Sequence, residues 1–530
     1  MTPTSPVAPL SPLQSLSSLS PLPPLDPRLA AVCDLSVPAA RDGAGRHEYD
    51  GTVQDLSPDA VRRGLAALGG PAGTKPYPDP HDEAHAAAAE EALRVRFGEL
   101  ELHRSNPLWH IENLDLTGYD RPYAPKAERD AARSAQLRQW PDAVDAAIEA
   151  LDRVPAALAD ATLPSARGLA ALLDPRGGPV HAAAGRAHAR FTAHLERAAA
   201  EGAPSAALGG PALARLLGAA EACTIDLTAL SARVDAERDR LRALLDESLR
   251  RLALAATPAD TVRALQADHP DADGLLAEFG ALVDETVAWT ARHDLVPHHD
   301  VDVVVRPMPD SQRRALAGLF ASAPHETDAA AAFRVTLPDN DWTSAQSEQW
   351  LSTGFNRTLM PNMAIHEVAP GHASHFRALR RAATDVRRTL HSDAFIEGWA
   401  HYCEELALEQ GFRDGDPRVA VAVAQDGLRR VTRFARAIGL HTGAMTLSDA
   451  AARFTEDVSL AGPAALHEAE RGLFDPSYGR YTWGKFAVLD LREQARERWG
   501  GDFSLRRFHS ALFDLGAPPL GLLHTALERG

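Results

Sequence analysis

A histidine–glutamate pair, His366–Glu367, lies in the segment M-A-I-H-E-V-A-P-G-H-A-S-H at residues 363–375. It begins like the motif H-E-x-x-H of zinc proteases, in which two histidines one helical turn apart bind the metal and the glutamate is the general base. Here Pro370 occupies the place of the second histidine, and the next histidine is His372. At about 100° per residue, a straight helix would point His366 and His372 about 240° apart, too far to share a metal.

Pro370 gives these two histidines a way to meet. Proline has no N–H to donate, and its ring clashes with the carbonyl four residues earlier, which here belongs to His366. The sequence therefore predicts that the helix breaks or bulges at Pro370-Gly371. Two residues looped out of the helix would return His372 to the face that carries His366.

A third candidate ligand follows in the segment F-I-E-G-W-A-H-Y-C-E at residues 395–404. The polar residues Glu397, His401 and Glu404 are spaced by four and seven residues, so they share one face of a predicted helix. This helix is bounded by residues suited to its two ends, Ser392 or Asp393 at the start and Gly411 after the end.

Two histidines and a carboxylate that leave one position open are typical of catalytic zinc, which makes His366, His372 and Glu397 the candidate ligands. Glu404 is interpreted as an acceptor for the outer nitrogen of a ligand histidine. His401 is either a second such support or a contact to substrate. A His-Glu pair on its own is usually a surface pair, and the alternative for this cluster is a buried polar group that only orders the core.

Together the two segments, H-E-x-x-P-G-H and E-G-W-A-x-Y-x-E, resemble the bacterial family catalogued as domain of unknown function 885. That family is grouped with the gluzincin-type metallopeptidases, and the resemblance covers most of the chain beyond its first few dozen residues. It implies a mainly α, two-lobed, gluzincin-like fold with a small, mostly antiparallel sheet beside the zinc helix. It also implies Zn2+ on His366, His372 and Glu397, with Glu367 as general base. The family usually has a second histidine after P-G-H, where this chain has Ala373.

Two later stretches also resemble the family. R-F-A-R-A-I-G-L-H, which ends at His441, matches its R-x-x-x-D-x-G-L-H pattern except at Ala437, and Y-T-W-G-K matches its Tyr-x-x-Gly element. From this likeness we expect Tyr481 to donate a hydrogen bond to the oxyanion of the reaction, with His441 as a further candidate. Arg433 or Lys485 would hold a substrate carboxylate.

The composition argues against several classes of protein. With 72 acidic and 55 basic residues, the formal net charge is −17, which speaks against nucleic acid or an anionic membrane as a partner. Three cysteines give no disulfide framework, and no apolar run approaches the roughly 18 residues of a membrane helix. Residues 1–25 lack the basic start and the continuous apolar core of a signal peptide. We therefore expect a cytoplasmic protein.

We expect three parts along the chain: a disordered Pro/Ser-rich tail at 1–25, a helical lobe at 26–295 and a zinc-binding catalytic lobe at 296–530, the lobes forming one continuous unit. Helical periodicity predicts a long helix over 225–253. The runs 301–305 and 333–337 are interpreted as short strands. The segment 106–115, which mixes aromatic and polar residues, either packs between helices or lines a cleft.

The sequence as a whole predicts a zinc-dependent hydrolase of peptide or related amide bonds. Glu367 would accept the proton of the attacking water, and zinc would polarise the carbonyl. A cleft between helical lobes would admit short, flexible substrates and exclude folded proteins. The alternative is a metal-free, non-catalytic helical binding protein on the same scaffold. The natural substrate and the oligomeric state stay open.

Overall fold

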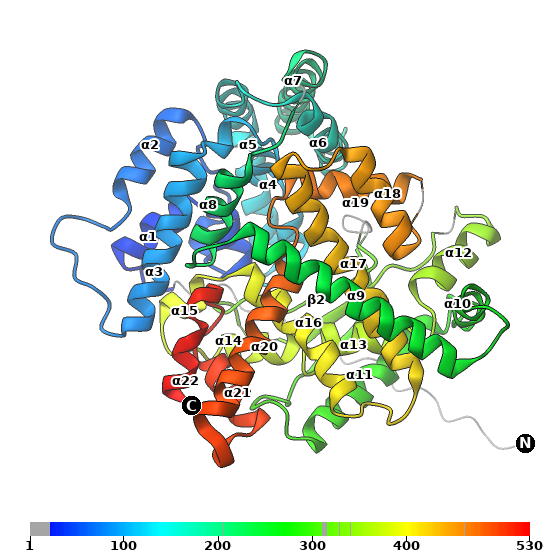
Figure 1. Ribbon diagram of the computed structural model, residues 1–530. Coiled ribbons are helices and arrows are strands. Elements are labelled where there is room, and N and C mark those ends of the chain that lie inside the picture. The colour runs from blue at the N-terminus through cyan, green and yellow to red at the C-terminus, as the bar shows by residue number, and fades with distance from the viewer. Residues whose placement is uncertain (1–21, 204, 310–314, 328, 340, 461) are drawn as a thin grey trace, which may run out of the picture.

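The computed structural model describes residues 22–530 except 204, 310–314, 328, 340 and 461, and it is mainly helical (Figure 1). The predicted tail at 1–25 lies almost wholly outside the described residues. The helices of the first half are α1 Pro27–Asp34, α2 Pro58–Ala67, α3 Pro80–Leu93, α4 Leu108–Leu114, α5 Lys126–Ala150, α6 Ala156–Gly168, α7 Gly178–Glu201, α8 Gly210–Ala220, α9 Leu227–Leu252, α10 Pro258–Gln266 and α11 Leu275–Arg292.

The second half returns to helices after a short sheet. These helices are α12 Ser344–Gly354, α13 Met360–Glu367, α14 His372–Leu379, α15 Asp385–Thr389, α16 Asp393–Glu409, α17 Pro417–Thr442, α18 Leu447–Val458, α19 Pro463–Phe474, α20 Arg480–Trp499, α21 Leu505–Asp514 and α22 Ala526–Arg529. Ser392 caps α16 as predicted, because its side chain accepts a hydrogen bond from the Phe395 N–H.

The sheet has three strands in the order β1-β3-β2, namely β1 Val303–Pro307, β3 Ala331–Val335 and β2 Ala317–Phe320. β3 is parallel to β1, with Phe333 opposite Val305, and antiparallel to β2, with Phe333 opposite Leu319. The predicted mostly antiparallel sheet is therefore mixed. The chain reverses direction twice and β3 inserts between the other two strands, so one of its neighbours is necessarily parallel.

The two halves of the chain are packed against each other. Helix α9, which matches the long helix predicted over 225–253, runs along α17 (Figure 1). Their contact is apolar, and Leu241 of α9 lies close enough to Gly427 that an added Cβ would be 3.0 Å from it. Helices from the two predicted lobes thus share an apolar core.

Two apolar cores hold the helices that carry the predicted ligands. One surrounds α16 and contains the fully buried Trp399 and Tyr402, together with Phe508 of α21. The other lies between α11, the sheet and α13, where Phe279, Phe333 and other rings meet edge to face. Burial of this much apolar surface fixes the positions of α13 and α16.

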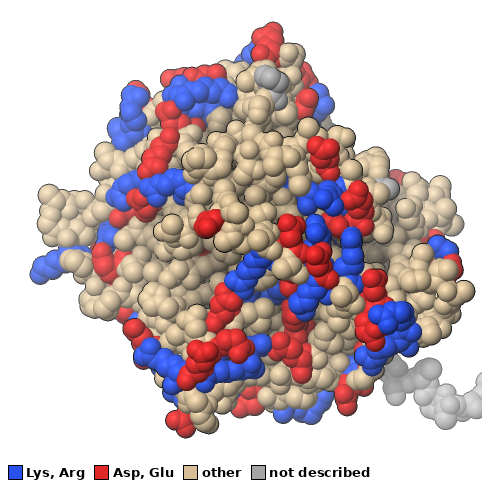
Figure 2. Space-filling view, viewed as in Figure 1, with Lys and Arg blue, Asp and Glu red and all other residues tan. Residues whose placement is uncertain are grey.

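The outer surface carries both signs of charge. On the face shown in Figure 2, acidic and basic side chains alternate among neutral ones rather than gathering by sign. Within the part of the chain that the structure describes, no helix has the length and apolar character needed to cross a bilayer.

Candidate metal centre

The helix that carries His366 breaks where the sequence predicts. α13 ends at Glu367 and α14 begins at His372, and the Gly371 N–H donates to the Ile365 carbonyl over 3.1 Å. A Cβ at position 371 would lie 2.0 Å from the His366 carbonyl oxygen, so only glycine fits there. The Trp399 indole N–H donates to the Pro370 carbonyl over 3.0 Å and ties the break to α16.

The break brings His366 and His372 together with Glu397. The Glu397 Oε2 atom lies 3.6 Å from His366 Nε2 and 3.5 Å from His372 Nε2, and the three ligand atoms lie within 4.8 Å of one another. These separations exceed those of N–H···O hydrogen bonds. A tetrahedral metal with bonds of about 2.0–2.2 Å holds its ligand atoms about 3.3–3.6 Å apart. The two separations from Glu397 therefore match those around a tetrahedral metal, and the remaining pair of ligand atoms lies within 4.8 Å.

The charges of the cluster favour a metal ligand at Glu397. Burial by itself would raise the pKa of Glu397, but the two histidines outweigh it and hold the pKa well below its ordinary value. Burial likewise opposes protonation of His366, but the neighbouring carboxylates of Glu397 and Glu404 prevail and raise its pKa to about 9. Without a cation between them, the histidine takes up a proton, which a metal would replace.

Glu404 contacts the Nδ1 atom of His366, while the Nε2 atom of the same ring faces Glu397. It is fully buried and lies 2.7 Å from His366 Nδ1, and it accepts hydrogen bonds from Arg430 Nη1 over 2.7 Å and Asn362 Nδ2 over 3.0 Å. A carboxylate at Nδ1 fixes the tautomer that leaves Nε2 free for a metal. His401 Nδ1 lies 3.5 Å from Glu404 Oε2, so His401 is a neighbour of this support.

Glu367 points from the end of α13 toward the sheet. Its Oε2 atom accepts a hydrogen bond from the Leu319 N–H of β2 over 2.8 Å, and the side chain is half-buried. This bond fixes one carboxylate oxygen beside the cluster and leaves the other to accept a proton. The strand that makes it, β2, was not predicted from the sequence.

Tyr481 lies at the start of α20, on the other side of Glu397. Its ring centre is 5.8 Å from the guanidinium carbons of both Arg430 and Arg433. Burial, and after it the negative charge of Glu397, raise the pKa of Tyr481, so the phenol is a neutral O–H donor. The structure thus places Tyr481 within electrostatic reach of the cluster.

Two glycines make this placement possible. Helices α16 and α20 approach so closely that a Cβ on Gly398 would lie 2.3 Å from the Gly484 Cα, and a Cβ on Gly484 would lie 1.8 Å from the Ala394 carbonyl oxygen. These glycines are the ones in E-G-W-A and Y-T-W-G. Their role is to bring the helix of Tyr481 against the helix of Glu397.

The two cations predicted to hold a substrate carboxylate have carboxylate partners inside the protein. Arg433 forms two hydrogen bonds with Glu468, of 2.8 and 2.7 Å. Lys485 is fully buried and pairs with Glu405 over 3.0 Å and, more closely, with Glu237. Because both charges are neutralised at close range, these residues stabilise contacts between helices rather than offer a free cation.

His441 also has a structural partner. Its ring is buried and its Nε2 atom lies 3.0 Å from the Gly472 carbonyl oxygen. Burial lowers its pKa to about 4, so the ring is neutral and its N–H donates to that carbonyl. This bond occupies the donor that was predicted for the oxyanion.

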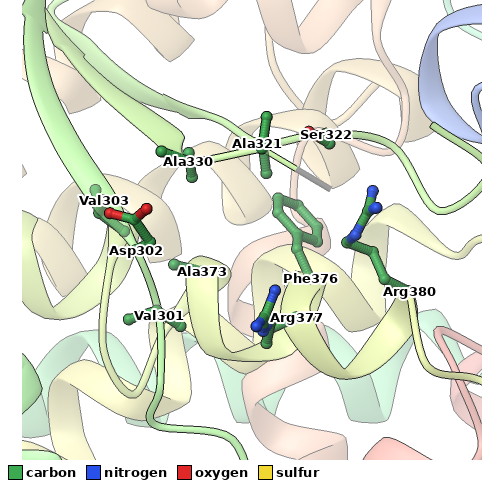
Figure 3. Close-up of a pocket in the computed structure, with 12 residues that line it drawn as sticks. Val301, Asp302, Val303, Ala321, Ser322, Ala330, Ala373, Phe376, Arg377 and Arg380 are labelled. Carbon is green, nitrogen blue, oxygen red and sulfur yellow. The ribbon is translucent and has the colours of Figure 1, made fainter. Parts of the chain in front are cut away.

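A pocket of about 220 Å³ lies beside α14 (Figure 3). Ala373, Phe376 and Arg377 of α14, with Arg380 directly after it, face residues at the strand ends; these are Ala321, Ser322 and Ala330. Phe376 stacks on His372 with ring centres 5.5 Å apart, so the pocket and the metal cluster share a wall.

The fold and the cluster define a class of protein: a helical protein with a small mixed sheet and a His-His-Glu site at a broken helix. Residues 38–527 match the model of a family described as "Bacterial protein of unknown function (DUF885)". The chain belongs to this family, as the motifs predicted. A comparison with curated proteins finds no match.

Two solved structures share the fold over nearly the whole chain. One is described as a "putative lipoprotein of unknown function" from Shewanella oneidensis, with 17% identity, a TM-score of 0.77 and coverage of 94% of this chain and 98% of the other. The second is described as a "putative lipoprotein" from Colwellia psychrerythraea, with 17% identity, a TM-score of 0.74 and coverage of 95% and 97%.

These two structures correct the prediction of a cytoplasmic protein. Proteins with the same fold are described as lipoproteins, a class held at a membrane by attached lipid. The prediction depended on few cysteines and on the lack of a membrane helix. A lipid-anchored protein needs neither disulfides nor a spanning helix, so composition carries no information on the compartment here.

Proposed function

We propose that the protein is a zinc-dependent hydrolase of peptide or related amide bonds, with a gluzincin-type active site. The observation that carries the proposal is the spacing of 3.5 and 3.6 Å between Glu397 and the two histidines, next to the carboxylate of Glu367. In this proposal His366, His372 and Glu397 hold the zinc ion. When bound, zinc supplies Lewis-acid polarisation of the scissile carbonyl and lowers the pKa of a water molecule.

The chain's own residues supply the proton transfers. Glu367 accepts the proton of the attacking water on the carboxylate oxygen that is not bonded to Leu319. It then gives that proton to the leaving amine as the amide bond breaks. Its fixed strand contact keeps the carboxylate oriented through both transfers.

Tyr481 is the donor proposed for the oxyanion. Its raised pKa keeps the phenol protonated at neutral pH, so its O–H can stabilise charge that develops on the carbonyl oxygen. Short, flexible chains are the proposed substrates, because Glu397 and its two histidine neighbours are enclosed by helices from both halves of the chain.

The test combines metal content with peptide digestion. Purified protein is analysed for metal by mass spectrometry and incubated with a peptide library whose products are identified by mass. We expect about one zinc per chain, loss of activity with a chelator and recovery on adding zinc. Glu367→Gln should keep the fold and the zinc but lose roughly three decades of turnover, because an amide cannot accept the proton.

The alternative, a binding protein without metal, makes the opposite prediction. A chain that takes up no zinc and cleaves no peptide would support it. Near-normal turnover by Glu367→Gln on a confirmed substrate would remove Glu367 as the base while leaving the zinc site intact.

A further inference from the structure

A second, larger cavity of about 430 Å³ lies between the N-terminal helices and the first turns of α16 and α20; we call it the chamber. Its volume is in the range of about 300–1,000 Å³ that small-molecule sites occupy. The N-terminal half supplies apolar and aromatic walls, among them Trp109 and Leu217, and the C-terminal half supplies Asp393, Arg480 and Trp483.

The chamber adjoins the metal cluster through two helices. Asp393 stands one turn before Glu397 on α16, and Arg480 directly precedes Tyr481 on α20. Burial, and to a smaller extent the charge of Glu397, raise the pKa of Asp393, which shows that the two carboxylates are near each other. The helices of Glu397 and Tyr481 therefore both border the chamber at their first turns.

Glu112 lines the chamber and does not take part in the hydrogen bonds or ion pairs found among the described residues. It lies in the last turns of α4, where the helix dipole disfavours negative charge. Burial, followed by the charge of Asp475, raises its pKa to about 7. Glu112 is accessible and lines the chamber, so a cation can bind beside its carboxylate.

Asp393 faces the same space. Its side chain keeps 74% of its surface accessible and lines the chamber, so it can contact a bound group. Its ion pair with Arg480 is long, at 3.7 Å, and Arg480 is held more closely by Asp475.

The charges of the chamber leave room for one cation. Three carboxyl groups, Glu112, Asp393 and Asp475, face two guanidinium groups, Arg96 and Arg480, so the formal charge is 2 − 3 = −1 when all three carboxyl groups are ionised. Arg96 lies over the Trp109 ring, 4.5 Å from its centre. Three other groups of the lining are neutral near pH 7. Burial lowers the pKa of His85 and of His391, and it raises the pKa of Glu221 to about 8.

We propose that the chamber binds an ammonium group of the substrate between Glu112 and Asp393, close to the bond that is cleaved. This inference rests on the proposed hydrolase and adds the chemical class of its substrate. The ammonium group belongs either to the N-terminus of a short peptide or to a lysine side chain. Trp109 and Leu217 contact the apolar part that carries the charge.

The experiment compares three peptide amides of equal length: tetra-alanine with a free N-terminus, its N-acetyl form, and an N-acetyl form with one lysine. For zinc-loaded wild type we expect kcat/KM to fall about tenfold or more when the only ammonium group is acetylated. Retained cleavage of the acetylated lysine peptide identifies the lysine side chain as the source, and its loss identifies the N-terminus.

The variants Glu112→Gln and Asp393→Asn should bring the ratio between charged and acetylated peptides toward one. The matched control is Glu409→Gln, which removes a carboxylate at the far end of α16, paired with Arg492, and should keep the wild-type ratio. Equal kcat/KM for all three peptides on the wild type would overturn the proposal.

A binding measurement distinguishes failure of the chamber proposal from failure of the proposed hydrolase activity. Calorimetry with free and acetylated tetra-alanine amide on the wild-type chain requires no turnover. Tighter binding of the free amine, lost in Glu112→Gln, supports the chamber even if no peptide is cleaved. Equal affinity for the two peptides contradicts it.

Discussion

Glu404 offers the sharpest test of how the metal cluster is supported. Glu404→Gln replaces a fully buried carboxylate that faces His366 Nδ1 at 2.7 Å and pairs with Arg430 at 2.7 Å. The amide keeps the shape but loses the charge that holds the His366 tautomer and orientation. We expect zinc to bind about 10–100-fold more weakly, which corresponds to about 1.4–2.8 kcal/mol.

The same change also costs stability. The Arg430 side chain is 13% exposed, and removing one partner of a buried pair costs about 3–5 kcal/mol. Asp426 also favours the charged form of Arg430, so we expect the lower end, about 3 kcal/mol. The two effects are separated by measuring unfolding of the metal-free protein and zinc affinity of the folded protein independently.

Zinc affinity is measured by competition with a coloured chelator, and unfolding by urea with the metal removed. Glu409→Gln serves as control, because it removes an arginine–carboxylate pair from the same helix, with bonds of 2.8 and 3.0 Å to Arg492, away from the cluster. If folded Glu404→Gln binds zinc like the wild type, Glu404 does not act on a metal ligand. Equal zinc losses in both variants would point to general loosening of α16.

Three further predictions concern the frame of the site. Gly484→Ala should destabilise the fold by about 3 kcal/mol, because its Cβ would lie 1.8 Å from a backbone oxygen. Gly280→Ala should leave stability unchanged, because a Cβ at position 280 would meet open space, and thermal unfolding compares the two variants. Burial opposes ionisation of Glu237, but ion pairs lower its pKa from 4.5 to about 2. The ionised carboxylate therefore stabilises the fold by about 3 kcal/mol above pH 4.5, and this stabilisation is lost as the pH falls toward 2. Acid unfolding of Glu237→Gln should lack this loss of stability between pH 4.5 and 2. Arg433→Ala should lower stability and affect free-acid substrates and their amides equally, because Arg433 is bound to Glu468; a selective loss on free acids in kinetic assays would contradict this.

Local chemistry made the metal cluster predictable. A proline four residues after His366 cannot continue its helix, and a glycine beside it permits the tight return, so the break follows from two adjacent residues. The pattern of Glu397 and Glu404 on one helix face likewise sets which side of α16 meets the histidines. Spacing was sufficient for these two relations because each spans fewer than ten residues. The assignment of Glu397 to the same site as the histidines, 25 residues after His372 (397 − 372), depended on the ligand types and the family resemblance.

Relations between distant segments were not predictable in this way. Periodicity marks a buried face but not the element that covers it, so the contact of β2 with Glu367 and the ion pairs of Arg433 and Lys485 appear only in the fold. The short run A-G-L-F of β2 carries too little β-type pattern to be distinguished from a loop. Arg430, which pairs with Glu404, stands among other arginines of α17 that the sequence does not separate.

The segment 106–115 contributes both to helix packing and to the lining of the chamber. It forms α4 and packs between helices, yet Trp109 and Glu112 also line the chamber, so both sequence interpretations describe part of it. The N-terminal half carries none of the three ligands, but it supplies apolar walls and two charged groups, Arg96 and Glu112, of the chamber. Enclosure of that space strengthens any ion pair formed inside it, so the half of the chain without the metal cluster is the half that would select the substrate.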